Sequence, residues 1–331
     1  MHPAEVGFSR YNIYVMVKII FAGSPDVARI TLEDLFEAQN TCGFQIAGVL
    51  SNPPTVKGRH KDLIPTPVAA FAAEKGIPVF TPEHLDSAAR EAISPLGADL
   101  LVSFAYGHIF GSKFLALFSM GGVNLHPSLL PKYRGCTPVP AAILNRDKET
   151  AVTVQTLSLK MDEGDILAQT HVTLNGTETT EYLLNYSARE GARLICEIIK
   201  EAEIAGKLPA GTPQSGEASY TGIIKKEDGR INWAESAEVI EAKIRAYYPD
   251  PGCWCMENGT TLKILEAKVL EGQSRNEDAG KVLDFSKADG ILVQTGNGIL
   301  AIRRLQRQGK NAMDYKSFMN GARNFLGTLL K

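Results

Sequence analysis

Short apolar runs alternate with helix-patterned segments through the first half of the chain, and no other feature limits the possible folds as strongly. The expected strands are the apolar runs at 17–22, 44–50, 77–80, 99–105, 122–125 and 151–159. The expected helices lie between these runs, at 27–39, 67–75, 82–93 and 138–144. Strands that alternate with helices predict a doubly wound sheet with helices on both faces. We therefore expect an α/β doubly wound, Rossmann-like domain over residues 16–205.

The first strand-to-helix turn tests whether such a sheet binds a dinucleotide. It reads AGSPD over 22–26, with one glycine where the dinucleotide fingerprint needs G-x-G-x-x-G, and Pro25 lies inside it. The phosphate-binding sequence GxxxxGK[ST] does not occur in the chain either. The sequence therefore argues against a dinucleotide-dependent enzyme and against a nucleoside triphosphatase of that class.

The pattern changes after a long amphipathic helix expected over 181–205. Residues 206–221 are rich in Gly, Pro, Ser and Thr, which is typical of a linker. Beyond it, two pairs of β-rich runs are joined by Glu257-Asn258-Gly259 and by Gly296-Asn297-Gly298. Asn-Gly between such runs is a strong hairpin signal. We expect residues 222–331 to form a small OB-like β-barrel.

Composition and charge describe an ordinary globular protein. The chain has 331 residues, enough for two cores, with 44% hydrophobic residues, 22% charged residues and a formal net charge of −2. Because the charges nearly balance, any binding of nucleic acid must depend on a local patch. No apolar run is long enough to cross a bilayer, so we expect no membrane partner.

The five cysteines and the first residues bear on the cellular compartment. The cysteines are scattered and odd in number, unlike a disulfide framework, and the Cys253/Cys255 pair lacks the second Cys/His cluster of a zinc site. We therefore expect no bound metal and a cytoplasmic location. Residues 1–15 do not resemble a signal peptide. We expect them to be a disordered extension, with Met16 as the natural start.

Three polar residues are candidates for chemistry. Asn124 and His126 lie two residues apart at a strand end, so they share one face, and Asp162 follows in MDEGDI. An imidazole can move a proton, a carboxylate can fix its tautomer, and an amide can donate to a developing oxyanion. No G-x-S-x-G nucleophile occurs. The pattern favours acyl transfer to an amine without a covalent enzyme intermediate.

The segment NLHPSLLP at 124–131, with a carboxylate 36 residues after His126, resembles the folate-dependent formyltransferase superfamily. Further segments resemble the branch of that superfamily that formylates charged initiator tRNA, and the resemblance extends from Met16 to the end of the chain. These segments are KIIFAGSPDVA, GRHKDLIPTPV, EKGIPVFTP, HPSLLPKYRG, MDEGDI, YTGIIKKEDGRINW and IRAYYPDPG.

The resemblance implies a reaction and its residues. A formyl group would move from 10-formyltetrahydrofolate to the α-amine of methionine esterified to initiator tRNA, with catalysis by Asn124, His126 and Asp162. His108 stands where the family usually has an apolar residue, and we expect it to be a passive residue at the pocket edge. The residues implied to border the tetrahydrofolate site are Ser128, Leu129, Leu130, Pro131, Ala105, Tyr106, Gly107 and Ile109.

Two basic segments are expected to contact the tRNA. The loop at 51–67 contains four prolines and one glycine, which we interpret as excluding regular structure, and it carries the implied contacts Lys57, Arg59 and Lys61. From Leu300 to the end, seven basic residues face one acid. From this second segment we expect contacts by Arg303, Arg304 and Arg307, and a steep loss of tRNA affinity with salt.

Other functions stay open at this point. Superfamily members that act on an amino sugar, or that hydrolyse formyltetrahydrofolate, share the three polar residues, and a non-catalytic RNA-binding protein could retain the fold. The two basic segments favour tRNA, because a sugar nucleotide needs only a few positive contacts. The intact Asn124, His126 and Asp162 argue against a non-catalytic protein. We expect a monomer without an obligate protein partner.

Overall fold

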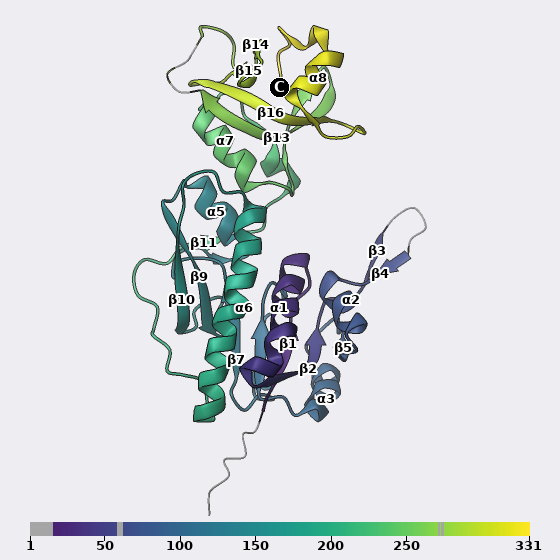
Figure 1. Cartoon of the computed structure of the whole chain (residues 1–331), viewed down its shortest axis with the longest axis vertical. Coiled ribbons are helices and arrows are strands. Elements are labelled where there is room, and N and C mark those ends of the chain that lie inside the picture. The colour runs from purple at the N-terminus through teal and green to yellow at the C-terminus, as the bar shows by residue number, and fades with distance from the viewer. Residues whose placement is uncertain (1–15, 58–61, 271, 273–274) are drawn as a thin grey trace, which may run out of the picture.

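The computed structural model describes residues 16–57, 62–270, 272 and 275–331 (Figure 1). The expected N-terminal extension and two of the expected tRNA contacts, Arg59 and Lys61, lie outside these residues. Figure 1 shows two bodies, a larger one built on a mixed sheet and a smaller one that contains the C-terminal strands. Helix α6 runs along the length of the larger body.

The larger body is built on a seven-stranded sheet. Its strands, in order across the sheet, are β10 (Ile166–Thr173), β9 (Glu149–Thr156), β7 (Gly122–His126), β6 (Leu100–Ser103), β1 (Val17–Ala22), β2 (Phe44–Leu50) and β5 (Val79–Phe80). Strands β7, β6, β1, β2 and β5 are parallel to one another, and β9 pairs antiparallel with both of its neighbours, β7 and β10. The expected doubly wound sheet is confirmed. Strand β10 was not expected, because its half-exposed residues form no apolar run.

Helices cover both faces of this sheet. Alternate residues of β1 point to opposite cores, with Ile19 and Phe21 in one cluster and Ile20 and Ala22 in the other. Helices α1 (Asp26–Cys42), α2 (Pro67–Glu74) and α6 (Thr180–Ala205) contribute to the first cluster. Helices α3 (Ser87–Ile93) and α4 (Ser112–Leu115) contribute to the second, with the 3-10 turn Ser94–Leu96 between them.

The direction of winding reverses at β1. The chain proceeds from β1 to β2 and β5 on one side, then returns to the other side of β1 as β6 and β7. The loops after β1 and β6 therefore leave the sheet in opposite directions. In open α/β sheets this point, at the carboxyl ends of the strands, is where ligands bind.

The loop at 51–67 contains a β-hairpin, which corrects the expectation that it lacks regular structure. Strands β3 (Thr55–Lys57) and β4 (Asp62–Ile64) pair antiparallel. The four prolines lie just outside the two strands, at 53, 54, 65 and 67, so they do not remove hydrogen bonds from the hairpin. The hairpin projects from the larger body (Figure 1).

The C-terminal part forms an antiparallel sheet of β12 (Cys253–Glu257), β13 (Thr260–Leu270), β16 (Ile299–Arg307), β15 (Gly290–Gln294) and β14 (Val282–Ser286), with β17 (Met313–Asp314) beside β16. Both expected hairpins are present. The last residues join the edges of the sheet: Lys331 exchanges two backbone hydrogen bonds with Met256 of β12, and the amide of Leu330 donates to the carbonyl of Gly280, just before β14. The sheet thus closes as the expected small barrel.

The two bodies share a hydrophobic core. Helix α5 (Pro138–Leu144) packs against α7 (Ala237–Ala246), and Val139 and Ile143 belong to the same buried cluster as Ile240 and Ile244. Helix α8 (Tyr315–Gly321) and the 3-10 turns Lys226–Gly229 and Arg323–Phe325 complete the smaller body. This apolar interface fixes the barrel beside the sheet.

Candidate active site

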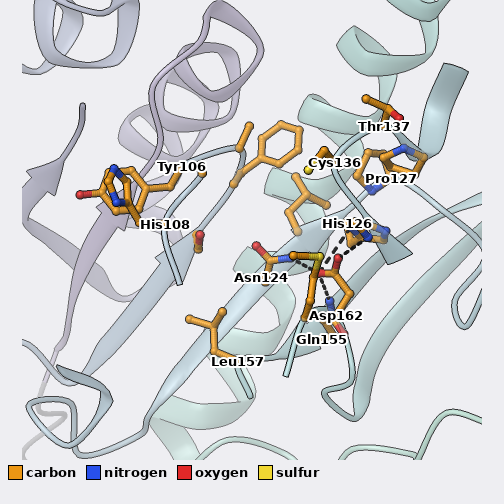
Figure 2. A pocket seen from close by; sticks show the side chains of 18 of the residues that line it. Tyr106, His108, Asn124, His126, Pro127, Cys136, Thr137, Gln155, Leu157 and Asp162 are labelled. Atoms are coloured by element: carbon orange, nitrogen blue, oxygen red, sulfur yellow. Dashed lines mark hydrogen bonds and ion pairs between the residues drawn. The ribbon is translucent and has the colours of Figure 1, made fainter. Parts of the chain in front are cut away.

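A cavity of about 600 Å³ opens at the carboxyl ends of β6 and β7 (Figure 2). The loops after β1 and β6 form one wall, where winding reverses, and the loop after β9 lies across from them. Asn124, His126 and Asp162 all line the cavity. The structure therefore brings together the three residues predicted to carry the chemistry.

Asp162 is held by several donors. Its Oδ1 accepts hydrogen bonds from Nε2 of Gln155 at 2.9 Å and, more weakly, from Nδ2 of Asn124 at 3.4 Å. Its Oδ2 accepts from the backbone N–H of Gly135 at 2.8 Å. The backbone of Asp162 has φ of 52°, a left-handed conformation that is strained for a residue with a Cβ. Strain of this kind at a cavity wall is consistent with a functional position.

Two glycines allow this arrangement. A Cβ at Gly164 would collide with the carbonyl oxygen of Thr156, so only glycine lets the loop after β9 fold back on the strand. Gly135 has φ of 105°, and a Cβ there would collide with the carbonyl oxygen of Thr221. The close approach at Gly135 is what brings its N–H to Asp162.

His126 is almost fully buried, with 4% of its surface exposed, and both ring nitrogens have defined neighbours. Its Nε2 donates to the backbone carbonyl of Tyr133 at 2.9 Å, so the proton of the neutral ring lies on Nε2. Its Nδ1 lies 3.6 Å from Oδ1 of Asp162. Burial lowers the pKa of His126, while the Asp162 carboxylate and the Tyr133 carbonyl act in the opposite direction. The resting ring is therefore neutral, with the Nδ1 lone pair directed towards Asp162.

Sequence reasoning missed two groups that support these residues. Gln155 is 1% exposed and lies beside Asn124 in the register of β9 and β7. Its signal was a polar side chain inside the apolar run at 151–159. The carbonyl of Tyr133 gave no signal, because a backbone group is independent of residue type.

The residues expected around the folate fall into two sets. Ala105, Tyr106, Gly107 and Ile109 all line the cavity, and burial raises the pKa of Tyr106 to about 12. Residues 128–131 lie in the turn beyond β7, outside the lining of this cavity. There the hydroxyl of Ser128 is buried and donates to a backbone carbonyl within the same turn. A direct folate contact by residues 128–131 stays a prediction.

His108 also lines the cavity and has a fixed partner. Its Nε2 lies 2.8 Å from Oδ1 of Asn52, just before the β3–β4 hairpin, and its ring lies 4.8 Å from the ring of Tyr106. The side chain thus connects the cavity wall to the base of the hairpin. Its predicted passive role is untested.

Four of the residues expected to contact tRNA are described by the structure: Lys57, Arg303, Arg304 and Arg307. Lys57 is the last residue of β3 and pairs with Asp62 of β4. Arg307 is paired with both carboxylate oxygens of Glu257, at 2.7 and 2.5 Å, and Arg303 donates to the carbonyls of Ala288 and Asp289. Arg304 is exposed, and its side chain makes no hydrogen bond or ion pair with any described residue.

The described residues contain neither a cluster of metal ligands nor a membrane-spanning helix. No group of His, Cys, Asp or Glu side chains in the described part of the chain has the arrangement of a metal site. Among the same residues, no helix has the length and apolar character needed to cross a membrane.

Comparison with family models identifies the class of protein that this fold and site define. Residues 16–199 match the model described as "Formyl transferase", and residues 223–323 match "Formyl transferase, C-terminal domain". The chain therefore belongs to the formyl transferase family.

Relatives in sequence are methionyl-tRNA formyltransferases. The enzyme of Treponema denticola is 43% identical over 323 residues, covering 94% of this chain and 98% of that protein. The enzyme of Treponema pallidum is 41% identical over 316 residues, covering 93% and 97%. The chain is therefore similar over nearly its whole length to methionyl-tRNA formyltransferases, in agreement with the resemblance of its sequence motifs.

Solved structures of lower identity share the fold. The sugar 3N-formyl transferase WlaRD has a TM-score of 0.60 at 21% identity, covering 89% of this chain and 99% of that one. The methionyl-tRNA formyltransferase from Clostridium thermocellum has a TM-score of 0.52 at 18% identity, covering 78% and 95%. HypX from Aquifex aeolicus has a TM-score of 0.62 at 14% identity, and this chain spans about half of its length.

Proposed function

We propose that this chain transfers a formyl group from 10-formyltetrahydrofolate to the α-amino group of methionyl-tRNA, producing the formylmethionyl-tRNA that initiates translation. The observation that carries the proposal is the cluster of Asn124, His126 and Asp162 at the wall of a ligand-sized cavity. Membership of the family and the names of its full-length relatives support the same activity.

The cavity fits the formyl donor in size and chemistry. Its volume of about 600 Å³ lies within the range of small-molecule sites. The lining combines the aromatic rings of Phe104 and Tyr106 with the open backbone of Gly107, and it includes the clustered polar side chains of Asn124, His126 and Asp162. Such a surface suits a flat heteroaromatic molecule whose reactive group faces Asp162. When bound, the folate supplies the formyl carbon that the amine attacks.

His126 and Asp162 manage the proton of the amine. The neutral ring presents the lone pair of Nδ1, because Nε2–H is committed to Tyr133. Asp162, 3.6 Å away, assists removal of the proton as the amine attacks, and Nδ1 takes it up. The imidazolium then stands beside a carboxylate that stabilises it. The same proton is available to the nitrogen that leaves.

Asn124 and the protonated His126 stabilise the negative charge that develops on the formyl oxygen. The Asn124 amide carries two hydrogens, and its bond to Asp162 at 3.4 Å is long. It therefore keeps donor capacity towards the cavity. The Asn124 donor is in place before the reaction, so it stabilises an oxyanion without reorganisation, whereas His126 gains its donor on Nδ1 when it takes up the proton. No side chain is needed as a covalent nucleophile.

The acceptor is held away from the chemistry, by the paired strands β3 and β4 and by the barrel. We propose contacts to the tRNA backbone from Lys57 in β3, from Arg59 and Lys61 between β3 and β4 in the sequence, and from Arg304 on the barrel, with a smaller share for Arg303 and Arg307. The exposure of Arg304 and its lack of an ion pair with described residues support its place in this set.

The remaining assignments follow from this activity. We propose residues 16–205 as the catalytic domain, 206–221 as the connection and 222–331 as the tRNA-binding domain. We also propose that the chain acts as a monomer, and in the cytoplasm, because its acceptor is a charged tRNA. The turn at 128–131 is proposed to contact tetrahydrofolate from outside the cavity described above.

The acceptor is the point on which the alternatives differ. The test is incubation with 10-formyltetrahydrofolate and three acceptors in parallel: charged initiator tRNA, an amino-sugar nucleotide, and water. We expect transfer to the first alone. Transfer to the sugar, or release of free formate without an acceptor, would replace the proposed function by one of the two related activities.

A further inference from the structure

Gln214, in the segment that connects the two bodies, reaches into the support of the catalytic centre. Its Nε2 donates at 2.8 Å to the backbone carbonyls of Asp162 and Gly164 and lies 3.1 Å from Oε1 of Gln155. Its Oε1 accepts from Nε and Nη2 of Arg134, at 3.2 and 2.8 Å. Gln214 thus forms hydrogen bonds both to the backbone of the loop after β9 and to Gln155, the side chain that holds the Asp162 carboxylate.

The chemistry of Arg134 fixes the direction of this chain of hydrogen bonds. A guanidinium has only donors, so the oxygen of the Gln214 amide must face Arg134 and its nitrogen must face the opposite way. Its two hydrogens are directed to the carbonyls of Asp162 and Gly164, and Oε1 of Gln155 lies 3.1 Å away as a third, shared acceptor. A hydrogen-bearing nitrogen at this position favours the oxygen of the Gln155 amide over its nitrogen as the neighbour. The nitrogen of Gln155 is thereby left to donate to Oδ1 of Asp162, at 2.9 Å. In this series of side chains, from Arg134 through Gln214 and Gln155 to Asp162, hydrogen-bearing nitrogens face oxygens at every step.

The same connecting segment also supports His126. The hydroxyl of Ser219 accepts from the N–H of Tyr133 at 2.9 Å, and the carbonyl of Ser219 accepts from the N–H of Arg134 at 2.8 Å. Next to it, β11 (Tyr220–Thr221) pairs with β8 (Arg134–Gly135). The Tyr133 carbonyl accepts the hydrogen bond from Nε2 of His126, so the segment supports both members of the His126–Asp162 pair.

We propose that Gln214 is a positioning residue for formyl transfer, which acts by holding Asp162 in its strained conformation and by orienting Gln155 towards the Asp162 carboxylate. The proposal rests on the proposed function. Residues 206–221, expected from composition to be a linker, thus include a structural part of the catalytic centre. Gln214 itself touches no reacting atom in this scheme; its effect passes through Asp162.

The test compares kcat with binding in two variants of the full chain. Gln214→Ala removes all of the hydrogen bonds, and Gln214→Glu keeps the shape while replacing the donor with an oxygen that faces carbonyls. We expect kcat for formyl transfer to fall about tenfold to a hundredfold in both, because a misplaced catalytic group costs factors of this size. The KM for methionyl-tRNA and the affinity for tetrahydrofolate are expected to change less than about threefold, since neither is bound through Gln214.

Two controls separate positioning from a general loss of structure. Glu217→Gln alters an exposed residue of the same segment and should leave kcat unchanged. In an Asp162→Asn background, Gln214→Ala should reduce kcat less than about threefold further, because its effect passes through the group already altered. If Gln214→Ala does not fold, the isosteric Gln214→Glu carries the test. Its kcat relative to that of the wild type should recover towards lower pH, where a protonated carboxyl can donate again.

The outcomes distinguish this proposal from the proposed function. A wild-type chain that formylates methionyl-tRNA, together with a Gln214→Glu variant of unchanged kcat, would overturn the positioning role and leave the function intact. Full additivity of Gln214→Ala with Asp162→Asn would also overturn it. A wild-type chain that transfers no formyl group to any acceptor would instead overturn the function on which the proposal rests.

Discussion

Nδ1 of His126 lies 3.6 Å from Oδ1 of Asp162, which is too far for a hydrogen bond. The opposite side of the ring is closed, because Nε2 donates to the Tyr133 carbonyl. The reactive lone pair is therefore directed towards the carboxylate at the cavity wall. Because both side chains line the cavity, this geometry suits an amine that approaches the two of them from the cavity.

The burial of His126 predicts a pH dependence of stability. Its pKa in the folded chain lies below 6.5, chiefly because burial disfavours the charged ring. As pH falls through about 6.5, the unfolded chain takes up a proton that the folded chain does not yet bind, so the free energy of unfolding decreases. Urea denaturation at about pH 7.5 and 5.5 should show a larger loss for the wild type than for His126→Gln. Equal losses would contradict the burial argument.

Arg304 and Arg307 form a matched pair for the tRNA surface. Arg304→Ala should weaken tRNA binding and reduce the slope of log affinity against log salt by about 1, since one phosphate contact is lost. Its free energy of unfolding should hardly change, because the exposed side chain has no ion pair with described residues. Filter binding of charged tRNA over a salt series measures the slope. An unchanged slope would remove Arg304 from the proposed contacts.

Arg307→Ala should act mainly on stability. The substitution leaves the carboxylate of Glu257, whose side chain is 10% exposed, without its bidentate partner and removes the guanidinium from above the Phe318 ring. We expect the free energy of unfolding to fall by about 2 kcal/mol. Chemical denaturation measures this loss, and a variant as stable as the wild type would show that the pair is not structural.

The thiols predict a simple labelling pattern. Cys136 is exposed at the cavity wall, whereas the other four cysteines are buried. Burial also raises the pKa of Cys196, Cys253 and Cys255 to about 12, which leaves them protonated at neutral pH. A thiol reagent should therefore label the native chain rapidly at Cys136 alone, and Cys136→Ser should abolish the rapid phase. A rapid phase that survives this substitution would contradict the burial of the others.

Periodicity and turn residues were enough to predict most of the elements. The expected strand at 44–50 and helix at 138–144 have the bounds of β2 and α5. The hairpin with Asn258-Gly259 follows because both residues adopt the positive φ that its turn requires. Strand β10 and the β3–β4 hairpin were missed, because the side chains of β10 are half-exposed and those of β4 are exposed, and neither segment forms a buried apolar run.

The centre of the site could be predicted, and its support could not. Asn124, His126 and Asp162 were recognisable from their residue types and their motif. Gln214 lies in a stretch whose composition indicates a linker, and the residues next to it in the sequence form no motif that would predict its contact with Asp162. The Tyr133 carbonyl is a backbone group. Contacts between segments about 50 residues apart in sequence depend on the fold, so a single sequence does not display them.

The most direct test of the account is formyl transfer to charged initiator tRNA by His126→Ala, measured together with its affinity for tetrahydrofolate. We predict that turnover is abolished while the affinity stays within several-fold of the wild-type value, because the ring moves the proton and is not the main wall of the cavity. Circular dichroism confirms that the variant is folded. Full activity in a folded His126→Ala variant would contradict the assignment of this cluster as the catalytic centre.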